Sequence, residues 1–214
     1  MGKNLADYRR NYTKGALLEN EISNNPFDLF SNWFEEIEAQ NDANEVNAMT
    51  VSTIGDDGFP KSRVVLLKEY DADGFIFYTN YTSEKGVALL QNSHVCLSFF
   101  WPVLERQVII KGIAEKSSEE KAQQYFRSRP RGSQLGAWAS NQSSEIASRE
   151  ILERSIQELE TRFEGKEIPK PDFWGGYLIK PVSMEFWQGR ASRLHDRILF
   201  ERIAESWNVK RLAP

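Results

Sequence analysis

The chain of 214 residues is long enough to form one domain that buries its own core without a metal or a disulfide. Its composition, with 27% charged, 40% apolar and 12% aromatic residues, excludes a disordered chain, collagen and a long coiled coil. The formal net charge of −4 argues against general binding to nucleic acid, which needs a basic face. We also find no apolar run of membrane-spanning length and no signal peptide, so we expect a cytoplasmic protein without a membrane partner.

The first part of the chain predicts an arm, then a helix, then antiparallel strands. Residues 1–24 are polar and lack a sustained period, which is typical of a mobile arm. Asn25 as N-cap and Pro26 at the first helical position begin an amphipathic helix. Alternation of apolar and polar residues then predicts three strands. They cover Met49 to Ile54, Ser62 to Tyr70 and Phe75 to Asn80.

The middle of the chain alternates helices and strands. Ser83 caps a short helix that runs to Gln91, and strands follow at His94 to Trp101 and Arg106 to Glu115. Ser117 and Glu120 form a capping box for a helix that reaches the break at Arg129-Pro130. A further helix is expected after Ser143, with its apolar stripe ending at Phe163.

The last part returns to strands, which are expected at Gly176 to Lys180, Met184 to Gln188, Ile198 to Ile203 and near Val209 to Leu212. These short strands with turn-sized gaps predict a mainly β fold, an antiparallel barrel with α-helices packed outside. We expect residues 1–24 to be an N-terminal arm and residues 25–214 to be a single domain.

The common nucleotide-binding and hydrolase motifs GxGxxG, GxxxxGK[ST], GxSxG and HExxH do not occur in the sequence. With two histidines and one cysteine, a zinc site would need carboxylates for most of its ligands. We therefore predict no metal site.

Two clusters of arginines stand out in this acidic chain, RSRPRGS around Arg129 and GRASRLHDR around His195. Arginine forks suit phosphate, although solvated charged loops are the plainer interpretation of such runs. Trp138 follows the first cluster and Trp187 precedes the second, so a planar heterocycle that carries a phosphate would suit both. His195 is either a hydrogen-bonded structural residue or a group that moves a proton.

The stretches SRVVLLK, FYTN, LERQVIIKG, YFRSRPRGSQLGAWAS, QSS, FWGGY, EFWQGR, RLHDR and RLAP follow one another in unbroken order from about Tyr8 to Pro214. Together they resemble the pyridoxine (pyridoxamine) 5′-phosphate oxidase family. The resemblance implies an FMN-binding split antiparallel (Greek-key) β-barrel and a homodimer with FMN at the subunit interface. The implied reaction oxidises pyridoxine 5′-phosphate or pyridoxamine 5′-phosphate to pyridoxal 5′-phosphate, with hydride passing from C4′ to flavin N5 and O₂ reduced to H₂O₂.

The resemblance also implies a role for individual residues. For FMN the implied set is Arg63, Val64, Val65, Leu66, Leu67, Lys68, Tyr78, Thr79, Lys85, Gln107, Gln142, Ser143, Trp187 and Arg197. For the substrate it is Arg9, Arg10, Tyr12, Lys68, Tyr125, Arg129, Ser133, Arg193, Leu194 and His195. Arg193 and His195 are the expected catalytic residues, and the arm that carries Tyr12 is the expected lid.

Two positions depart from the family pattern. Glu84-Lys85 stands where the family commonly has Arg-Lys facing the FMN phosphate, and Val46 stands where a proline is common. We expect Glu84 to point to solvent as an acid at a helix N-terminus, outside the site. Two other functions remain open: a split-barrel flavin reductase, and a carrier of pyridoxal 5′-phosphate without catalysis.

Overall fold

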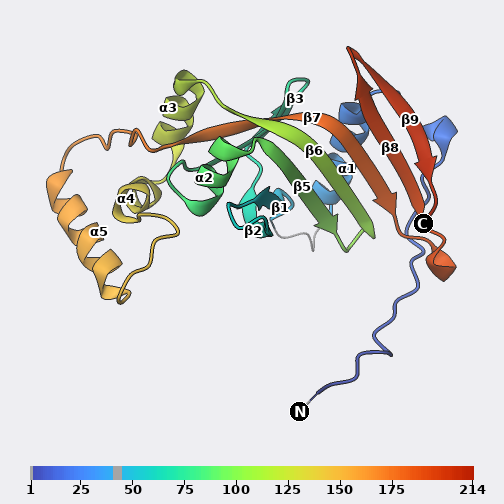
Figure 1. Ribbon diagram of the computed structural model, residues 1–214, viewed down its shortest axis with the longest axis horizontal. Helices are drawn as coiled ribbons and strands as arrows, with labels where there is room; N and C mark the ends of the chain where they lie inside the picture. Colours follow the sequence, from blue (N-terminus) through green and yellow to red (C-terminus); the bar gives the residue numbers. More distant parts are fainter. Residues whose placement is uncertain (1, 41–44) are drawn as a thin grey trace. The chain divides into compact units, whose positions relative to one another are not determined.

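The computed structural model describes residues 2–40 and 45–214 (Figure 1). Its helices are η1 (Glu19–Glu21), α1 (Pro26–Glu38), α2 (Glu84–Gln91), α3 (Glu119–Ser128), α4 (Arg131–Ala139), α5 (Glu150–Arg162) and η2 (Ala191–Arg193). Its strands are β1 (Ala48–Ile54), β2 (Pro60–Leu66), β3 (Glu69–Asp71), β4 (Gly74–Asn80), β5 (His94–Trp101), β6 (Arg106–Lys116), β7 (Trp174–Gln188), β8 (Asp196–Ile203) and β9 (Ser206–Leu212).

Hydrogen-bonded neighbours in the sheet follow the order β2-β1-β5-β6-β7-β4-β3, and β8 pairs with both β7 and β9. The pairings with a defined register, β3 with β4, β4 with β7, β7 with β8 and β8 with β9, are all antiparallel. The chain divides into two compact units. The first comprises 1–50, 96–111 and 181–214, and the second comprises 51–95 and 112–180. The division into an arm and a single domain stays a prediction.

The first unit has an aromatic core around α1. Asn25 caps this helix as predicted, because its Oδ1 accepts a hydrogen bond from the Phe27 N–H at 3.1 Å. The apolar stripe of α1 buries Phe30 and Trp33, whose rings lie 5.3 Å from those of Phe99 and Phe186. Edge-on aromatic contacts at this spacing add to the free energy gained by burying the rings.

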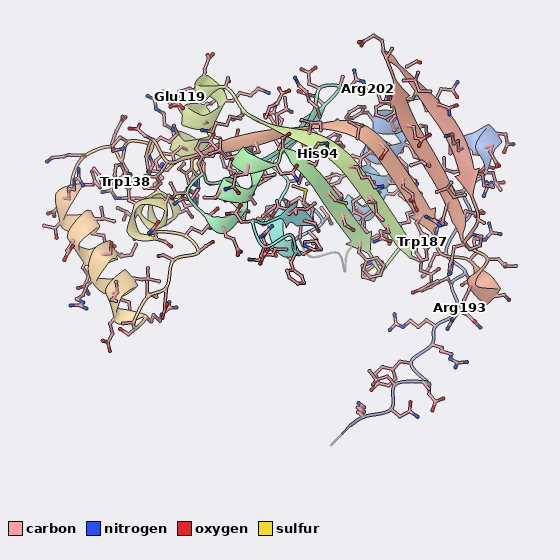
Figure 2. All side chains as sticks on the ribbon, in the orientation of Figure 1. His94, Glu119, Trp138, Trp187, Arg193 and Arg202 are labelled. Carbon is pink, nitrogen blue, oxygen red and sulfur yellow. The ribbon has the colours of Figure 1, made fainter. Side chains whose placement is uncertain are left out.

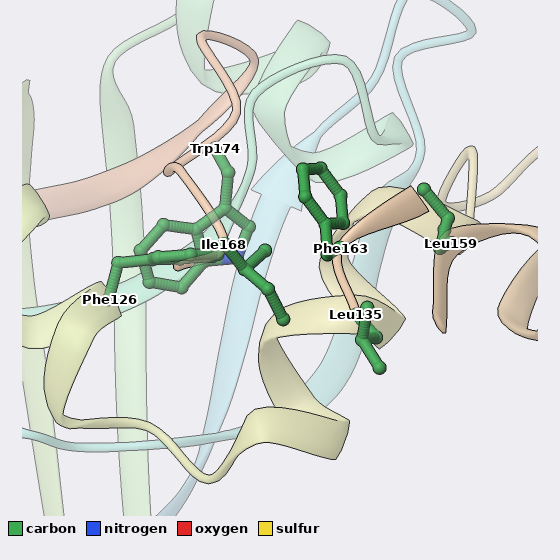
Figure 3. Packing of buried hydrophobic residues seen from close by; sticks show 6 residues of the cluster. All are labelled: Phe126, Leu135, Leu159, Phe163, Ile168 and Trp174. Atoms are coloured by element: carbon green, nitrogen blue, oxygen red, sulfur yellow. The ribbon is translucent and has the colours of Figure 1, made fainter. Parts of the chain in front are cut away.

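The second unit has a core where α3, α4 and α5 meet the first residue of β7. Phe126, Leu135, Phe163 and Trp174 are all buried there (Figure 3). The rings of Phe126 and Trp174 lie 5.2 Å apart in an edge-on contact. This core holds Trp174, which also lines a pocket described below.

Strand β7 is one long strand, Trp174–Gln188, where the sequence predicted two, at Gly176 to Lys180 and Met184 to Gln188. The residues before it pair with β4, up to Ile179 opposite Phe75, and the residues after it pair with β8 from Ser183 opposite Glu201. Pro181 therefore falls between the two paired segments, where the missing proline N–H costs neither ladder a hydrogen bond.

Several other boundaries differ from the prediction. Helix α4 was missed, since Gly132 and Gly136 weaken its helical signal, and α5 begins at Glu150, well after Ser143. The strand predicted over 62–70 is split into β2 and β3.

The cap of α3 is Ser118, and the predicted cap Ser117 is wrong. Ser118 Oγ accepts a hydrogen bond from the Lys121 N–H at 3.2 Å. Ser117 instead continues the sheet, because its N–H donates to Gly176 O at 2.9 Å. The Ser117 Oγ is buried and finds no hydrogen-bond partner among the described residues.

We predict opposite results for these neighbouring serines. Ser118→Ala should lower the free energy of unfolding by about 1 kcal/mol, because it removes the cap of α3. Ser117→Ala should cost nothing or stabilise, because it removes a buried hydroxyl that has no partner. Urea unfolding of both variants and the parent measures the difference, and an equal loss in both variants would contradict the assignment of the cap.

Candidate functional site

The second unit contains a cavity of about 1070 Å³, which we call the β2–β4 pocket. Small-molecule sites commonly measure about 300 to 1000 Å³, so this one has room for more than one ring system. It is lined by β2, by the end of β4, by the start of α2, by the α3–α4 turn and by the segment after α4. These elements bring together side chains from widely separated parts of the sequence.

A cationic part of this pocket is built around Lys85, the second residue of α2, whose side chain is buried. Its Nζ donates to Gln142 Oε1 at 2.9 Å and to Thr79 Oγ1 at 3.3 Å, both neutral oxygens. Thr79 Oγ1 also donates to Gln142 Oε1 at 3.0 Å, which fixes the amide. Burial lowers the pKa of Lys85 to about 8, and the nearby positive charge of Arg63 acts in the same direction.

Arg63 on β2 adds a second cation. Its Nη1 donates to Thr53 Oγ1 at 2.8 Å and to Lys61 O at 2.9 Å, which holds the guanidinium in place. Burial lowers the pKa of Arg63 from its ordinary value, and the side chain remains a cation at neutral pH. Two buried or half-buried cations that face one pocket favour an anionic ligand.

The aromatic part of the pocket is a set of three nearly parallel rings. Tyr78 stacks on Tyr125 with the ring centres 4.0 Å apart, and on Trp174 at 5.4 Å. The Arg129 guanidinium lies 4.8 Å from the Trp174 ring centre. Burial raises the pKa of Tyr78 to about 12, so its hydroxyl stays protonated at neutral pH.

Arg129 also carries an unsatisfied donor. Its Nη1 atom is buried and has no hydrogen-bond partner in the described part of the chain. Buried guanidinium nitrogens are normally paired, because leaving a charged donor without a partner costs several kcal/mol. Arg129 therefore adds a further cation to the pocket, next to flat aromatic surface.

A second group of candidate residues lies in the first unit, and we call Tyr12, Trp187 and His195 the Tyr12 cluster. The His195 ring lies 4.7 Å from Trp187 and 5.8 Å from Tyr12, and Tyr12 meets Trp187 edge-on at 5.7 Å. His195 Nδ1 accepts a hydrogen bond from the Arg190 N–H at 3.1 Å, so the neutral ring carries its proton on Nε2. An imidazole held in this way presents Nε2 as a donor.

The loop before β8 holds strained backbone beside this cluster. Ser192 and Arg193 have φ angles of 57° and 62°, in the left-handed region that residues with a Cβ seldom adopt. Arg193 is exposed and lies at the same end of the β7–β8 pair as Trp187 (Figure 2). Strained residues of this kind cluster at ligand sites, where the surrounding structure holds them.

Asp196 anchors that loop and the N-terminal arm together. Its carboxylate accepts hydrogen bonds from Arg190 at 2.7 Å, from Arg211 at 2.9 Å and from the Leu17 N–H at 3.1 Å. Burial alone would raise the pKa of Asp196, but the Leu17 N–H and Arg190 outweigh it and lower the pKa.

The structure places most of the predicted site residues in the β2–β4 pocket. They are Arg63, Val64, Val65, Leu66, Lys68, Tyr78, Thr79, Lys85, Tyr125, Arg129, Ser133, Gln142 and Ser143. Leu67 turns into the core and is buried. The remaining predicted residues belong to the first unit, and they are Arg9, Arg10, Tyr12, Gln107, Trp187, Arg193, Leu194, His195 and Arg197. Among these, Gln107 bonds Ser98 Oγ at 3.2 Å, and Arg197 bonds Glu185 at 2.8 Å and lies opposite Trp187 in the β7–β8 ladder.

Three residues in or near the pocket differ from expectation. Glu84 does not simply face solvent, because it lines the pocket and pairs with Lys61 at 2.7 Å. Trp138 does not line the pocket, since its Nε1 donates to Pro169 O and its ring packs on Phe163. The tryptophan that lines the pocket is Trp174, which lies in the stretch FWGGY and was not predicted as a site residue.

Within the described residues, no group of three His, Cys, Asp or Glu side chains is placed to hold a metal ion. In the same part of the chain, every helix is too short or too polar to cross a membrane.

We predict that the packing of the Tyr12 ring against the backbone of Gly189 helps to hold the arm. A Cβ added at Gly189 would lie 2.8 Å from Tyr12 Cγ, and Glu105 Oε2 accepts hydrogen bonds from Thr13 N and Lys14 N at 2.7 and 2.9 Å. Gly189→Ala should therefore loosen the arm, so that trypsin cleaves after Lys14 several-fold faster. Timed proteolysis with mass spectrometry measures this rate. Gly132→Ala, whose Cβ meets no atom within 4 Å, is the control and should cleave like the parent.

Comparison with known proteins identifies related sequences over nearly the whole chain. Residues 35–163 match the family described as pyridoxamine 5′-phosphate oxidase, and residues 174–214 match the pyridoxine 5′-phosphate oxidase C-terminal dimerisation region. The pyridoxine/pyridoxamine 5′-phosphate oxidase of Christiangramia forsetii is 58% identical over 214 residues, covering all of both chains.

Two solved structures show the same fold. PhzG from Burkholderia lata, in complex with tetrahydrophenazine-1-carboxylic acid, matches with a TM-score of 0.86 and 29% identity over 93% of this chain and 98% of its own. A pyridoxamine 5′-phosphate oxidase-related, FMN binding protein from Nostoc punctiforme matches with a TM-score of 0.69 and 14% identity over 87% and 96%. The expected fold class, a split antiparallel β-barrel with helices, is confirmed.

Proposed function

Because the chain belongs to the pyridoxine/pyridoxamine 5′-phosphate oxidase family, a family of oxidoreductases, we propose that it oxidises pyridoxine 5′-phosphate or pyridoxamine 5′-phosphate to pyridoxal 5′-phosphate. These matches confirm the family resemblance seen in the sequence. One observation carries the proposal: the β2–β4 pocket combines two cationic sites, at Lys85 and at Arg129, with stacked aromatic rings. A cofactor and a substrate that are both planar and phosphorylated suit this combination.

The residues present fit FMN as the cofactor. Lys85 is a buried cation bonded to neutral oxygens only, and Arg63 stands on the same pocket wall. A phosphate bound there would give Lys85 an anionic partner, which its present hydrogen bonds do not supply. We assign Arg63, Lys85 and Ser143 to the FMN phosphate. The backbone of residues 63–68, together with Gln107, would bond the polar edge of the ring.

The substrate phosphate would bind Lys68, Tyr125, Arg129 and Ser133, all of which line the same pocket. The Arg129 guanidinium supports this assignment, because it lies 4.8 Å from the Trp174 ring centre in a pocket that both residues line. Arg193, Leu194 and His195 would cover the pyridine ring and orient its C4′ substituent. Arg9, Arg10 and Tyr12 would close over the ligand and exclude water.

The match to a C-terminal dimerisation region supports a homodimer. We propose that FMN lies at the subunit interface, so that the pocket of one protomer is completed by first-unit residues of its partner. Gln107, Trp187 and Arg197 would then reach FMN, and Arg193 and His195 would reach the substrate. A cytoplasmic location is part of the same proposal.

Bound FMN supplies the hydride acceptor, at its N5 atom, and a route for the electrons to O₂, which is reduced to H₂O₂. The chain's own residues hold the substrate and manage its proton. His195, with its proton on Nε2, would hydrogen-bond the substrate or move a proton at that atom, and the Arg193 cation would hold the substrate's negative charge.

An anaerobic titration tests the oxidase directly. Purified protein reconstituted with FMN is mixed with pyridoxine 5′-phosphate without oxygen, and the visible absorption of the flavin is followed. We expect bleaching that is reversed by air. Bound flavin that stays oxidised with both the alcohol and the amine substrate would contradict the oxidase. Reduction by a nicotinamide instead would favour a flavin reductase, and retained pyridoxal 5′-phosphate without flavin would favour a carrier.

Arg193→Ala should lower turnover far more than it lowers FMN content, because we assign this exposed arginine to the substrate and not to the cofactor. Steady-state kinetics and the flavin absorption per protein chain measure the two effects in one preparation. Full turnover in the variant would show that Arg193 has another role.

A pH-rate profile of His195→Asn, compared with the parent, separates proton transfer by His195 from orientation of the substrate.

The affinity for FMN should depend on pH through Lys85. The lowered pKa means that Lys85 loses its proton as the pH rises through about 8 in the free protein, whereas the flavin phosphate becomes a dianion above about pH 6. FMN should therefore bind most tightly between these values and weaken above pH 8, by at most about tenfold per pH unit. Fluorescence quenching of FMN measures the dissociation constant. Lys85→Arg should abolish the fall, and a flat profile to pH 9.5 in the parent protein would contradict it.

A further inference from the structure

The cationic part of the β2–β4 pocket contains one anion of its own, the carboxylate of Glu84. Glu84 Oε1 lies 2.7 Å from Lys61 Nζ, and Oε2 lies 3.7 Å from Arg63 Nη2. Lys61 is also 3.3 Å from Asp57. The Glu84 carboxylate therefore lies between two cations that belong to different positions of the same strand.

Strand geometry explains why Lys61 and Arg63 act together. Side chains two residues apart in a strand point to the same face, and β2 alternates between exposed positions at Ser62 and Val64 and half-buried ones at Lys61 and Arg63. Both cations line the pocket that Lys85 also lines. The three side chains thus present positive charge to one region from two elements, β2 and α2.

The Glu84 carboxylate, held between Lys61 and Arg63, marks a position that another anion can occupy. A phosphate carries about −1.5 to −2 charge and three acceptor oxygens, so it competes strongly with a carboxylate for the same donors. Glu84 is about half exposed and stands at the first position of α2, where its side chain has room to leave the pair.

We propose that Lys61 is a further residue that binds the FMN phosphate, and that Glu84 is an internal anion which this phosphate displaces from Lys61 and Arg63. The inference rests on the proposed function, since it takes FMN as the ligand. In this family the position of Glu84 is commonly cationic. The proposal explains how this chain keeps a positive site, because Lys61 on β2 supplies the missing charge.

Two single substitutions should shift FMN affinity in opposite directions. Glu84→Gln removes the internal competitor and should lower the dissociation constant for FMN several-fold. Lys61→Met removes a phosphate donor and should raise it. The Lys61→Met result has two causes, however, because this variant also leaves Glu84 without its partner beside the incoming phosphate.

The decisive comparison is therefore made in the Glu84→Gln background. There, adding Lys61→Met should raise the FMN dissociation constant by about tenfold, which is about 1.4 kcal/mol. Fluorescence titration of the apoprotein measures this, and riboflavin, which lacks the phosphate, should bind both variants equally. Equal FMN affinity with and without Lys61 in this background would overturn the role of Lys61. Weaker FMN binding by Glu84→Gln than by the parent would overturn the displacement.

Lys180 provides a matched control. It pairs with Glu115 at 2.7 Å, with side chains 48% and 51% exposed, against 39% and 49% for Lys61 and Glu84. It does not line the pocket. Lys180→Met should leave FMN binding unchanged, and a change as large as that of Lys61→Met would show a general charge effect and overturn the inference. A parent protein that binds no FMN would overturn the proposed function itself, a result distinct from equal binding by the variants.

Discussion

The β2–β4 pocket depends on a buried ammonium group, that of Lys85. Moving a charge out of water costs several kcal/mol unless hydrogen bonds and a counter-charge offset it. Here the hydrogen bonds come from Gln142 and Thr79, which are neutral, and burial together with the Arg63 charge lowers the pKa of Lys85. A bound phosphate would complete the site, so the pocket is built at some expense to the stability of the ligand-free protein.

The surrounding structure holds Lys85 in that position by packing and capping. Ser83 Oγ accepts from the Gly86 N–H at 3.3 Å and donates to Asn80 O at 2.7 Å, which ties the start of α2 to the end of β4. A Cβ at Gly86 would lie 2.3 Å from Tyr81 O, so only glycine allows this approach. The helix therefore begins against the strand end, and its second residue is directed into the pocket.

Local signals in the sequence were sufficient for elements whose ends are set by neighbouring residues. Asn25 with Pro26 and Ser83 with the helix after it were predicted correctly, because a cap and its helix lie within one turn. Ser117 was misjudged because the cap of α3 was decided by strand pairing with Gly176, which is far away in the sequence. Strand β7 was likewise predicted as two strands, because its length is set by pairing with β4 on one side of Pro181 and with β8 on the other.

The candidate site shows the same division between local and distant causes. The arginine clusters were visible as short runs, and the structure places Arg129 of the first run in the pocket. Glu84 was read by a local rule, that an acid at a helix N-terminus faces solvent and favours the helix dipole. That rule still applies, because Glu84 does begin α2 and is half exposed. It cannot predict the contact with Lys61, because Lys61 lies 23 residues earlier and meets Glu84 only when β2 and α2 come together. An unusual charge in a binding site is therefore best interpreted together with the charges that the fold sets beside it.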